Sequence, residues 1–260
     1  MVTHDLEGMP SLSLGSGPPL LFLPGLTPTH AAPHGFARRF ALHQMRPFAD
    51  RRQVWWVGRR RGLTAHTTMA DIADDYATAL QLWGADPLDV LGVSTGGSVA
   101  LQLAADHPHL VRRLVLVSSA CRLGARGQAA QRRVLEALES RRLREAGATL
   151  MRLGAAGRFS GDALAALGWL APGMVVGEGG TDLRATIRAE DGFDVTSRLA
   201  AIQAPTLVVG GDRDAFYGEE VFQETARLLP EGQLRLYRGE GHVGVLRDRR
   251  LARDVNAFLG

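Results

Sequence analysis

The chain has 260 residues, of which 45% are hydrophobic and 22% charged, which fits one large domain or one core domain with an insertion. All 30 basic residues are arginines, scattered in pairs and triplets, and 27 acidic residues lower the net charge to +3. We interpret the arginines as residues of solvated helix faces and loop ends, and we therefore expect no nucleic-acid partner. The single cysteine, Cys121, excludes an internal disulfide, and no apolar run reaches transmembrane length, so we expect a cytoplasmic protein without membrane contact.

Short apolar runs alternate with segments of helical spacing along most of the chain. Strands are expected at 10–14, 20–23, 53–57, 88–93, 114–118, 205–214 (with a polar, turn-rich end) and 233–237. Helices are expected at 35–49, 69–84, 98–107, 219–230 and 243–259. This alternation predicts an α/β fold with a mostly parallel sheet flanked by helices, in which chemistry collects at the carboxyl ends of the strands.

The character of the sequence changes between residues 122 and 199. This segment is rich in Arg, Ala, Leu and Gly, and helical spacing at 134–154, as one helix or two, and at 160–174 precedes the glycine-rich GEGG of 177–180. We therefore expect a core formed by residues 1–121 and 200–260, with a helical insertion at 122–199.

The six residues GVSTGG, 92–97, join an apolar strand directly to a helix. A strand can turn into a helix within so few residues only where no Cβ obstructs the turn, and Gly92 and Gly96 stand two residues on either side of Ser94. The spacing is that of the G-x-S-x-G nucleophile elbow, which presents a serine hydroxyl at the tip of a sharp turn. Ser94 is thus the candidate nucleophile.

A serine hydroxyl needs a base to take its proton and an acid to orient that base. His242 follows a late strand and a glycine-rich turn, RGEGH, just before the last helix. Asp212 and Asp214 both follow the preceding strand, and Asp214 lies further into the loop. The order Ser, Asp, His, each at the carboxyl end of a strand, predicts a catalytic triad of Ser94, Asp214 and His242, with Asp212 as the other choice of acid.

Acyl chemistry also needs N–H donors for an oxyanion. We expect them from the backbone of Thr95, directly after the nucleophile, and of Leu26, in the loop after the strand LLFL. We expect no metal and no cofactor, because Pro33 spoils the regular helix that a metal-binding pair His30 and His34 would need.

Four segments of this chain resemble the α/β-hydrolase superfamily: FLPGL, GVSTGG, PTLVVGGDRD and GEGHVGVLRDRRLARDVNAFL. The resemblance covers nearly the whole chain outside the insertion. It implies the roles of nucleophile for Ser94, acid for Asp214 and base for His242, and a cap over the active site for the insertion. Two segments depart from the family pattern: Pro24-Gly25 replaces a common His-Gly, and GRRRGLTAHT replaces a segment that usually carries an aspartate.

We expect a serine hydrolase that cleaves a carboxylic ester or lactone of a small-molecule acyl substrate through an acyl-enzyme. The substrate pocket is expected to involve His30 and, in the insertion, Phe159, Trp169 and Met174, although packing of the insertion onto the core is the favoured role for most apolar residues there. The alternatives are an acyltransferase or cofactor-free perhydrolase on the same triad, a C–C or amide bond hydrolase, and a ligand-binding protein without turnover. The sequence leaves open whether the protein forms a homo-oligomer.

Overall fold

A computed structural model describes residues 2–84 and 87–260. Its strands are β1 (Val2–Leu6), β2 (Met9–Leu14), β3 (Pro19–Leu23), β4 (Gln53–Val57), β5 (Leu88–Val93), β6 (Val111–Val117), β7 (Thr206–Gly211) and β8 (Gly232–Tyr237). Its α-helices are α1 (Gly35–Ala49), α2 (Met69–Leu82), α3 (Thr95–Asp106), α4 (Ala125–Glu139), α5 (Leu143–Leu153), α6 (Arg158–Leu170), α7 (Pro172–Val176), α8 (Thr181–Asp191), α9 (Glu219–Leu228) and α10 (Arg249–Leu259). Three short 3₁₀ helices are η1 (Pro108–Leu110), η2 (Thr196–Ala201) and η3 (Val245–Arg247).

The eight strands form one sheet in the order β1-β2-β4-β3-β5-β6-β7-β8. The pairs from β4 to β8 are parallel, whereas β1 and β2 extend the sheet as an antiparallel hairpin. The expected mostly parallel α/β sheet is confirmed. The β1–β2 hairpin was not expected; it turns at Glu7 and Gly8, both with positive φ.

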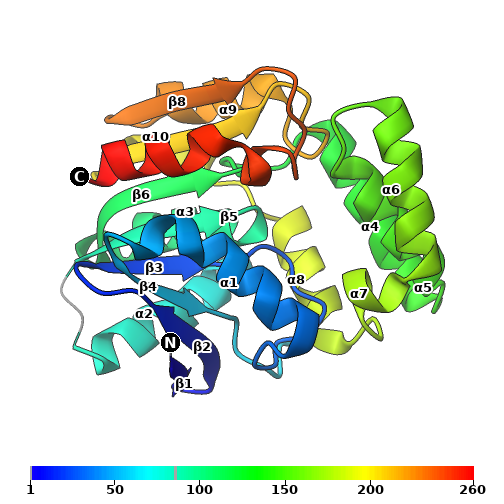
Figure 1. Cartoon of the computed structure of the whole chain (residues 1–260), viewed down its shortest axis with the longest axis horizontal. Helices are drawn as coiled ribbons and strands as arrows, with labels where there is room; N and C mark the ends of the chain where they lie inside the picture. The colour runs from blue at the N-terminus through cyan, green and yellow to red at the C-terminus, as the bar shows by residue number, and fades with distance from the viewer. Residues whose placement is uncertain (1, 85–86) are drawn as a thin grey trace.

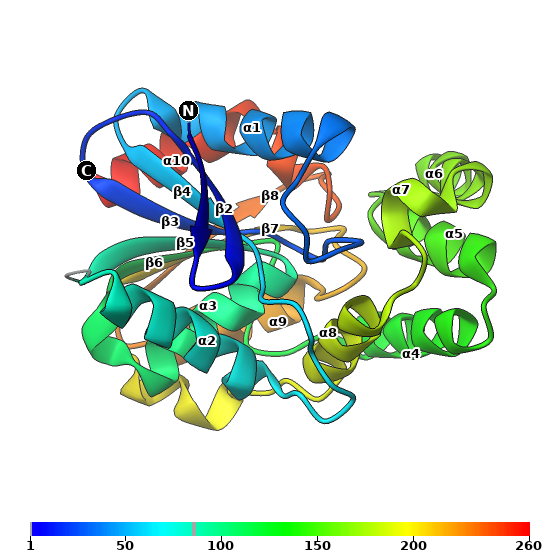
Figure 2. The same ribbon diagram turned by 90° about the horizontal axis from the view of Figure 1, so that it is seen from below.

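Helices cover both faces of the sheet. In Figure 2, α1 and α10 lie on one face and α2, α3 and α9 on the other. Each face buries its own apolar cluster: Val115 and Val117 of β6 point to the α1/α10 side, while Leu114 and Leu116 point to the α2/α3/α9 side. The central strand β5 is buried along its whole length, as its apolar residues Leu88, Val90, Leu91 and Val93 predict.

The helices α4 to α7 gather at one end of the sheet, and α8 lies between them and the core (Figures 1 and 2). The chain leaves the core for the insertion and returns to the core at one place, where Arg122 and Asp194 form an isolated antiparallel bridge. The segment expected as one helix or two at 134–154 is two, because the chain breaks between Glu139 and Leu143 with a positive φ at Arg141. The insertion therefore stands beyond the carboxyl ends of the parallel strands (Figure 1).

Candidate active site

Ser94 lies at the junction of β5 and α3 with strained backbone angles, φ +51° and ψ −126°. The turn is possible because Gly92 and Gly96 carry no side chain at positions where the surrounding backbone leaves no room for one. A Cβ on Gly96 would lie 2.2 Å from the carbonyl oxygen of Leu23, and one on Gly92 would lie 2.4 Å from the carbonyl oxygen of Gly96. Local sterics thus hold the Ser94 hydroxyl at the carboxyl end of the sheet, over the N-terminus of α3.

Ser94, His242 and Asp214 form a continuous hydrogen-bonded chain. The Ser94 Oγ lies 2.9 Å from His242 Nε2, and His242 Nδ1 lies 2.8 Å from Asp214 Oδ2. Asp214 is 4% exposed and His242 is 7% exposed, so the chain is largely screened from water. This is the geometry in which an imidazole, oriented by a carboxylate, can take a serine proton.

The loop after β7 decides between the two candidate acids. The second oxygen of Asp214, Oδ1, accepts hydrogen bonds from the backbone N–H of Phe216 at 2.8 Å and of Tyr217 at 3.3 Å, which fixes the carboxylate. Asp212 instead accepts from the N–H of Gly239 at 2.7 Å, on the turn after β8. The structure therefore brings Asp214 to His242 and leaves Asp212 on a turn.

The histidine loop is anchored from the core and from the insertion. The Ser118 hydroxyl donates to the carbonyl of His242 at 2.9 Å, and the Phe216 ring packs on the imidazole with its centroid 4.5 Å away. The N–H of Val243 donates to the carbonyl of Gly154, in the connection between α5 and α6, at 3.0 Å. The insertion thus touches the loop that carries the candidate base.

The two residues expected to supply N–H donors flank Ser94. Thr95 is the first residue of α3, where a backbone N–H has no partner within the helix. Gly25 packs against the elbow, since a Cβ there would lie 3.3 Å from the Ser94 Cβ, and Leu26 follows it in a half-buried loop. Both amides therefore belong to backbone that borders the candidate nucleophile.

The residues expected in a substrate pocket lie in two different settings. His30 is buried, and its Nδ1 lies 2.8 Å from the carbonyl of Arg60. Burial, together with the charge of the adjacent Arg59, lowers the pKa of His30 to about 4, so the ring is neutral at neutral pH. Phe159, Trp169 and Met174 are exposed on α6 and α7, and their place in a pocket stays a prediction.

Two buried charged residues near the triad were missed by the sequence analysis. The side chain of Arg59 is 1% exposed, and that of Glu190, on α8, is 2% exposed. The interpretation of the arginine clusters as solvated is therefore wrong for Arg59, and also for Arg52, which is 3% exposed and pairs with the buried Asp89. The only local signal was that GRRRGL, 58–63, stands where relatives usually carry an aspartate.

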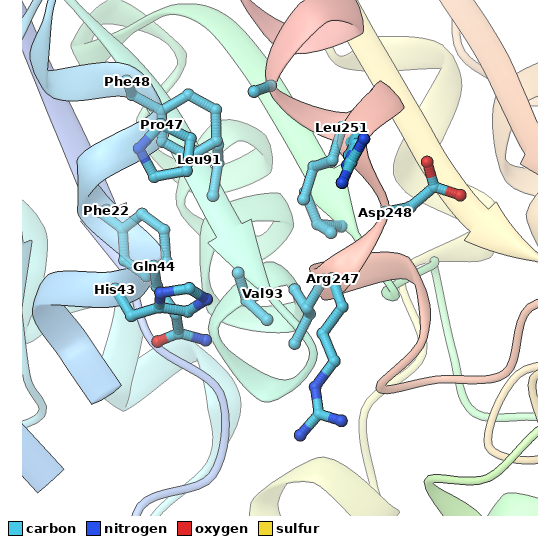
Figure 3. Close-up of a pocket in the computed structure, with 14 residues that line it drawn as sticks. Phe22, His43, Gln44, Pro47, Phe48, Leu91, Val93, Arg247, Asp248 and Leu251 are labelled. Atoms are coloured by element: carbon cyan, nitrogen blue, oxygen red, sulfur yellow. The ribbon is translucent and has the colours of Figure 1, made fainter. Parts of the chain in front are cut away.

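A cavity of about 200 Å³ between α1 and α10 is distinct from the triad (Figure 3). Its floor is formed by sheet residues such as Phe22, Leu91 and Val93, and His43 and Arg247 lie at its sides. Val93 immediately precedes the candidate nucleophile Ser94, but none of the three candidate triad residues lines this cavity.

Within residues 2–84 and 87–260, no three His, Cys, Asp or Glu side chains are grouped to hold a metal ion. Over the same residues, no helix combines the length and the apolar character needed to cross a bilayer.

Comparisons with known proteins agree with this architecture. A family model described as alpha/beta hydrolase fold matches residues 18–248. Pyrrolizixenacetamide deacetylase of Xenorhabdus hominickii is 26% identical over 168 residues, which cover 63% of this chain but only 62% of that protein. A Variovorax paradoxus (strain S110) protein named "Putative carbamate hydrolase RutD" is 30% identical over 189 residues, covering 70% of this chain and 68% of that protein.

Solved structures share the fold at low sequence identity. MGS-M2, an alpha/beta hydrolase from a Medee basin deep-sea metagenome library, has a TM-score of 0.80 at 14% sequence identity. The match covers 100% of this chain and 97% of the MGS-M2 chain. The enol-lactonase of Burkholderia xenovorans LB400 has a TM-score of 0.77 at 15% identity and covers 99% of each chain. These structures share the fold, and the family model that matches residues 18–248 shows that the chain belongs to the α/β hydrolase family.

Proposed function

We propose that this hydrolase cleaves a carboxylic ester or lactone of a small molecule through an acyl-enzyme on Ser94. The observation that carries the proposal is the unbroken chain of contacts from Ser94 Oγ to His242 Nε2 at 2.9 Å and from His242 Nδ1 to Asp214 Oδ2 at 2.8 Å. With Nδ1 protonated and donating to Asp214, Nε2 is free to accept the Ser94 proton.

In the acylation step, Ser94 Oγ forms a bond to the acyl carbon as its proton passes to His242 Nε2. The carbonyl π electrons move to the oxygen, and the backbone N–H groups of Leu26 and Thr95 donate to the oxyanion. When the tetrahedral intermediate collapses, His242 gives its proton to the leaving alkoxide, and in a lactone the alkoxide stays attached to the acyl group. A water molecule, deprotonated by His242, then hydrolyses the acyl-enzyme and returns Ser94 to its starting state.

The same triad can cleave an acyl–nitrogen bond, and this is the second candidate function. It is supported by the names of the two curated relatives, a deacetylase of an acetamide and a carbamate hydrolase. The chemistry differs only at the leaving group, where an amine must receive the proton from His242 before the bond breaks.

The test is labelling with a fluorophosphonate probe, measured by intact mass on the wild type and on Ser94→Ala. We expect one adduct on the wild type and none on Ser94→Ala. Unlabelled wild type is then assayed with p-nitrophenyl esters of graded chain length, with lactones, and with the matching anilides and carbamates. Folded wild type that forms no adduct would contradict the proposal, and faster cleavage of anilides or carbamates than of the matched esters would favour the second candidate.

A further inference from the structure

The carboxylate of Glu190 reaches from the insertion into the catalytic edge of the core. It accepts hydrogen bonds from Thr95 Oγ1 at 2.7 Å, Gln131 Nε2 at 2.8 Å, Ser98 Oγ at 3.2 Å and the Tyr217 hydroxyl at 3.4 Å. Burial raises the pKa of Tyr217 well above its ordinary value, which keeps the phenol protonated and able to donate. A buried carboxylate is costly unless it is hydrogen-bonded, and this one is held by four donors from three segments of the chain: α3, α4 and the loop before α9.

Two of these donors stand in the first turn of α3. Thr95 directly follows the nucleophile and is a proposed oxyanion donor through its backbone, and Ser98 lies three residues further on. By holding both hydroxyls, Glu190 fixes the orientation of the helix end that presents the Thr95 N–H. The carboxylate also lies at a helix N-terminus, where the helix dipole favours negative charge.

The guanidinium of Arg59 holds the opposite side of the same site. It donates to the carbonyls of Gly25 at 2.8 Å and Pro24 at 3.1 Å, and to Thr27 Oγ1 at 3.2 Å. These acceptors bracket Leu26, whose N–H is the other proposed oxyanion donor. An arginine fork is suited to this task because it offers several donors in a fixed plane.

The bond from Arg59 to the Gly25 carbonyl has a direct consequence for Leu26. The Gly25 C=O and the Leu26 N–H belong to one peptide unit, which is planar, and in its trans form the two groups point in opposite directions. Fixing the oxygen on Arg59 therefore fixes the N–H so that it points away from Arg59. A charged donor on the oxygen also polarises the unit and strengthens its N–H as a donor.

We propose that Arg59 and Glu190 are positioning residues for the oxyanion hole, Arg59 for the Leu26 N–H and Glu190 for the Thr95 N–H. This inference rests on the proposed function. Neither residue touches the reacting atoms; each acts through backbone that does. Because Glu190 belongs to α8, the inference also makes the docking of the insertion on the core a condition for efficient catalysis.

The test compares conservative variants with matched neighbours. Arg59→Lys keeps the charge but loses the fork, and Glu190→Gln keeps the size but loses the charge. Their controls are Arg60→Lys, one residue along, and Asp191→Asn, next to Glu190 on α8 and paired with the exposed Arg132. Each variant is assayed with a p-nitrophenyl ester that the wild type hydrolyses and with the corresponding thionoester, and its fold is checked by circular dichroism.

A displaced oxyanion donor affects the two substrates unequally, because sulfur accepts hydrogen bonds more weakly than oxygen. We expect Arg59→Lys and Glu190→Gln each to lower kcat for the ester by about 10- to 100-fold with little change in KM. The ratio of the ester rate to the thionoester rate should fall in both variants and stay unchanged in both controls. Equal losses on both substrates, or wild-type rates, would overturn the inference, because a purely structural role lowers both rates together.

Two further measurements keep the result decisive. If Glu190→Gln does not fold, Thr95→Val removes the hydroxyl that donates to Glu190 but keeps the Thr95 N–H, and the same fall in the ratio is expected. Phosphonylation of Ser94 is followed in parallel. No adduct on folded wild type would contradict the proposed function and this inference with it, whereas wild-type phosphonylation rates in Arg59→Lys and Glu190→Gln would contradict this inference alone.

Discussion

The sheet core and the helical insertion are stabilised by different means. The core buries a large apolar cluster on each face of the sheet, and close backbone contacts such as that between Gly96 and Leu23 fix the loops that carry the candidate triad. The insertion has a small aliphatic cluster of its own, around Val134, Leu138 and Ile187, and leaves large apolar side chains exposed on α6 and α7. Tightly packed backbone therefore holds the candidate triad, while the insertion adds side chains such as Leu153, Ala185 and Phe193 to one core cluster and leaves others exposed.

The junction between the two regions includes a row of polar contacts along α8. Asp182, Thr186 and Glu190 are spaced four residues apart and so share one face of the helix. Asp182 accepts from the N–H groups of Gly62 and Leu63 at 2.9 and 2.8 Å, Thr186 Oγ1 lies 3.3 Å from His30 Nε2, and Glu190 reaches the elbow. Such contacts are directional, so they fix the register of the insertion on the core more sharply than apolar packing does.

The largest expected effect on activity comes from a substitution in the core. Asp214→Asn should lower kcat by about 10⁴-fold, because an amide no longer holds the imidazole in the tautomer that accepts the Ser94 proton. Asp212→Asn is the matched control and should stay within severalfold of the wild type, because its partner is the Gly239 N–H. Steady-state kinetics on an ester measures both, and a larger loss in Asp212→Asn would refute the choice of acid.

A pair of glycine substitutions compares the packing of the two regions directly. Gly96→Ala should lower the free energy of unfolding by roughly 3 kcal/mol or more, because its Cβ would meet the carbonyl oxygens of Leu23 and Pro24 at 2.2 and 2.5 Å. Gly173→Ala, on α7, meets no atom within 4 Å and should be neutral or stabilising by about 0.5 kcal/mol. Urea denaturation measures both free energies of unfolding. An unchanged stability in Gly96→Ala would show that the backbone at the elbow can shift to accommodate the added methyl group.

The polar junction should respond to acid through His30. Its pKa falls from 6.5 in the unfolded chain to about 4 in the fold, so the unfolded chain binds the proton first as the pH drops. This contribution is fully present above the unfolded pKa and is lost between pH 6.5 and 4; from pH 7 to 5 we expect a loss of about 2 kcal/mol.

His30→Gln isolates this contribution from that of other titrating groups, because the amide can hydrogen-bond but does not titrate. Denaturation curves at pH 7 and pH 5 for both proteins give the difference. An identical pH dependence in the wild type and His30→Gln would show that His30 is not the group that titrates.

The smallest expected effect on stability belongs to the exposed face of the insertion. Phe159→Ala should change the free energy of unfolding by no more than about 0.5 kcal/mol, because the side chain is 90% exposed. If Phe159 lines the path of an acyl chain, KM for a long-chain ester should rise by about threefold while KM for an acetate stays unchanged. The same KM as the wild type for both esters would remove Phe159 from the pocket.

Local sequence signals predict those features of the fold that depend on neighbouring residues. Helix α1 spans the expected residues 35–49, and the glycines around Ser94 predict the elbow from local sterics alone. The β1–β2 hairpin was missed because Glu7-Gly8 is a weaker turn signal than Asn-Gly. The final helix was expected as one run at 243–259 but starts at Arg249, where the Asp248 side chain caps it by accepting from the Arg250 N–H.

The charged residues buried beneath the candidate site follow from tertiary packing and not from local pattern. Arg59 belongs to an arginine triplet, and Glu190 stands on a helix face spaced like a solvated one, so local pattern places both in water. In the fold, Glu190 meets Thr95, which is 95 residues away, and Arg59 meets the loop at Gly25, which is 34 residues away. A charged side chain is buried or exposed according to partners distant in the sequence, and those partners are set by the packing of whole elements.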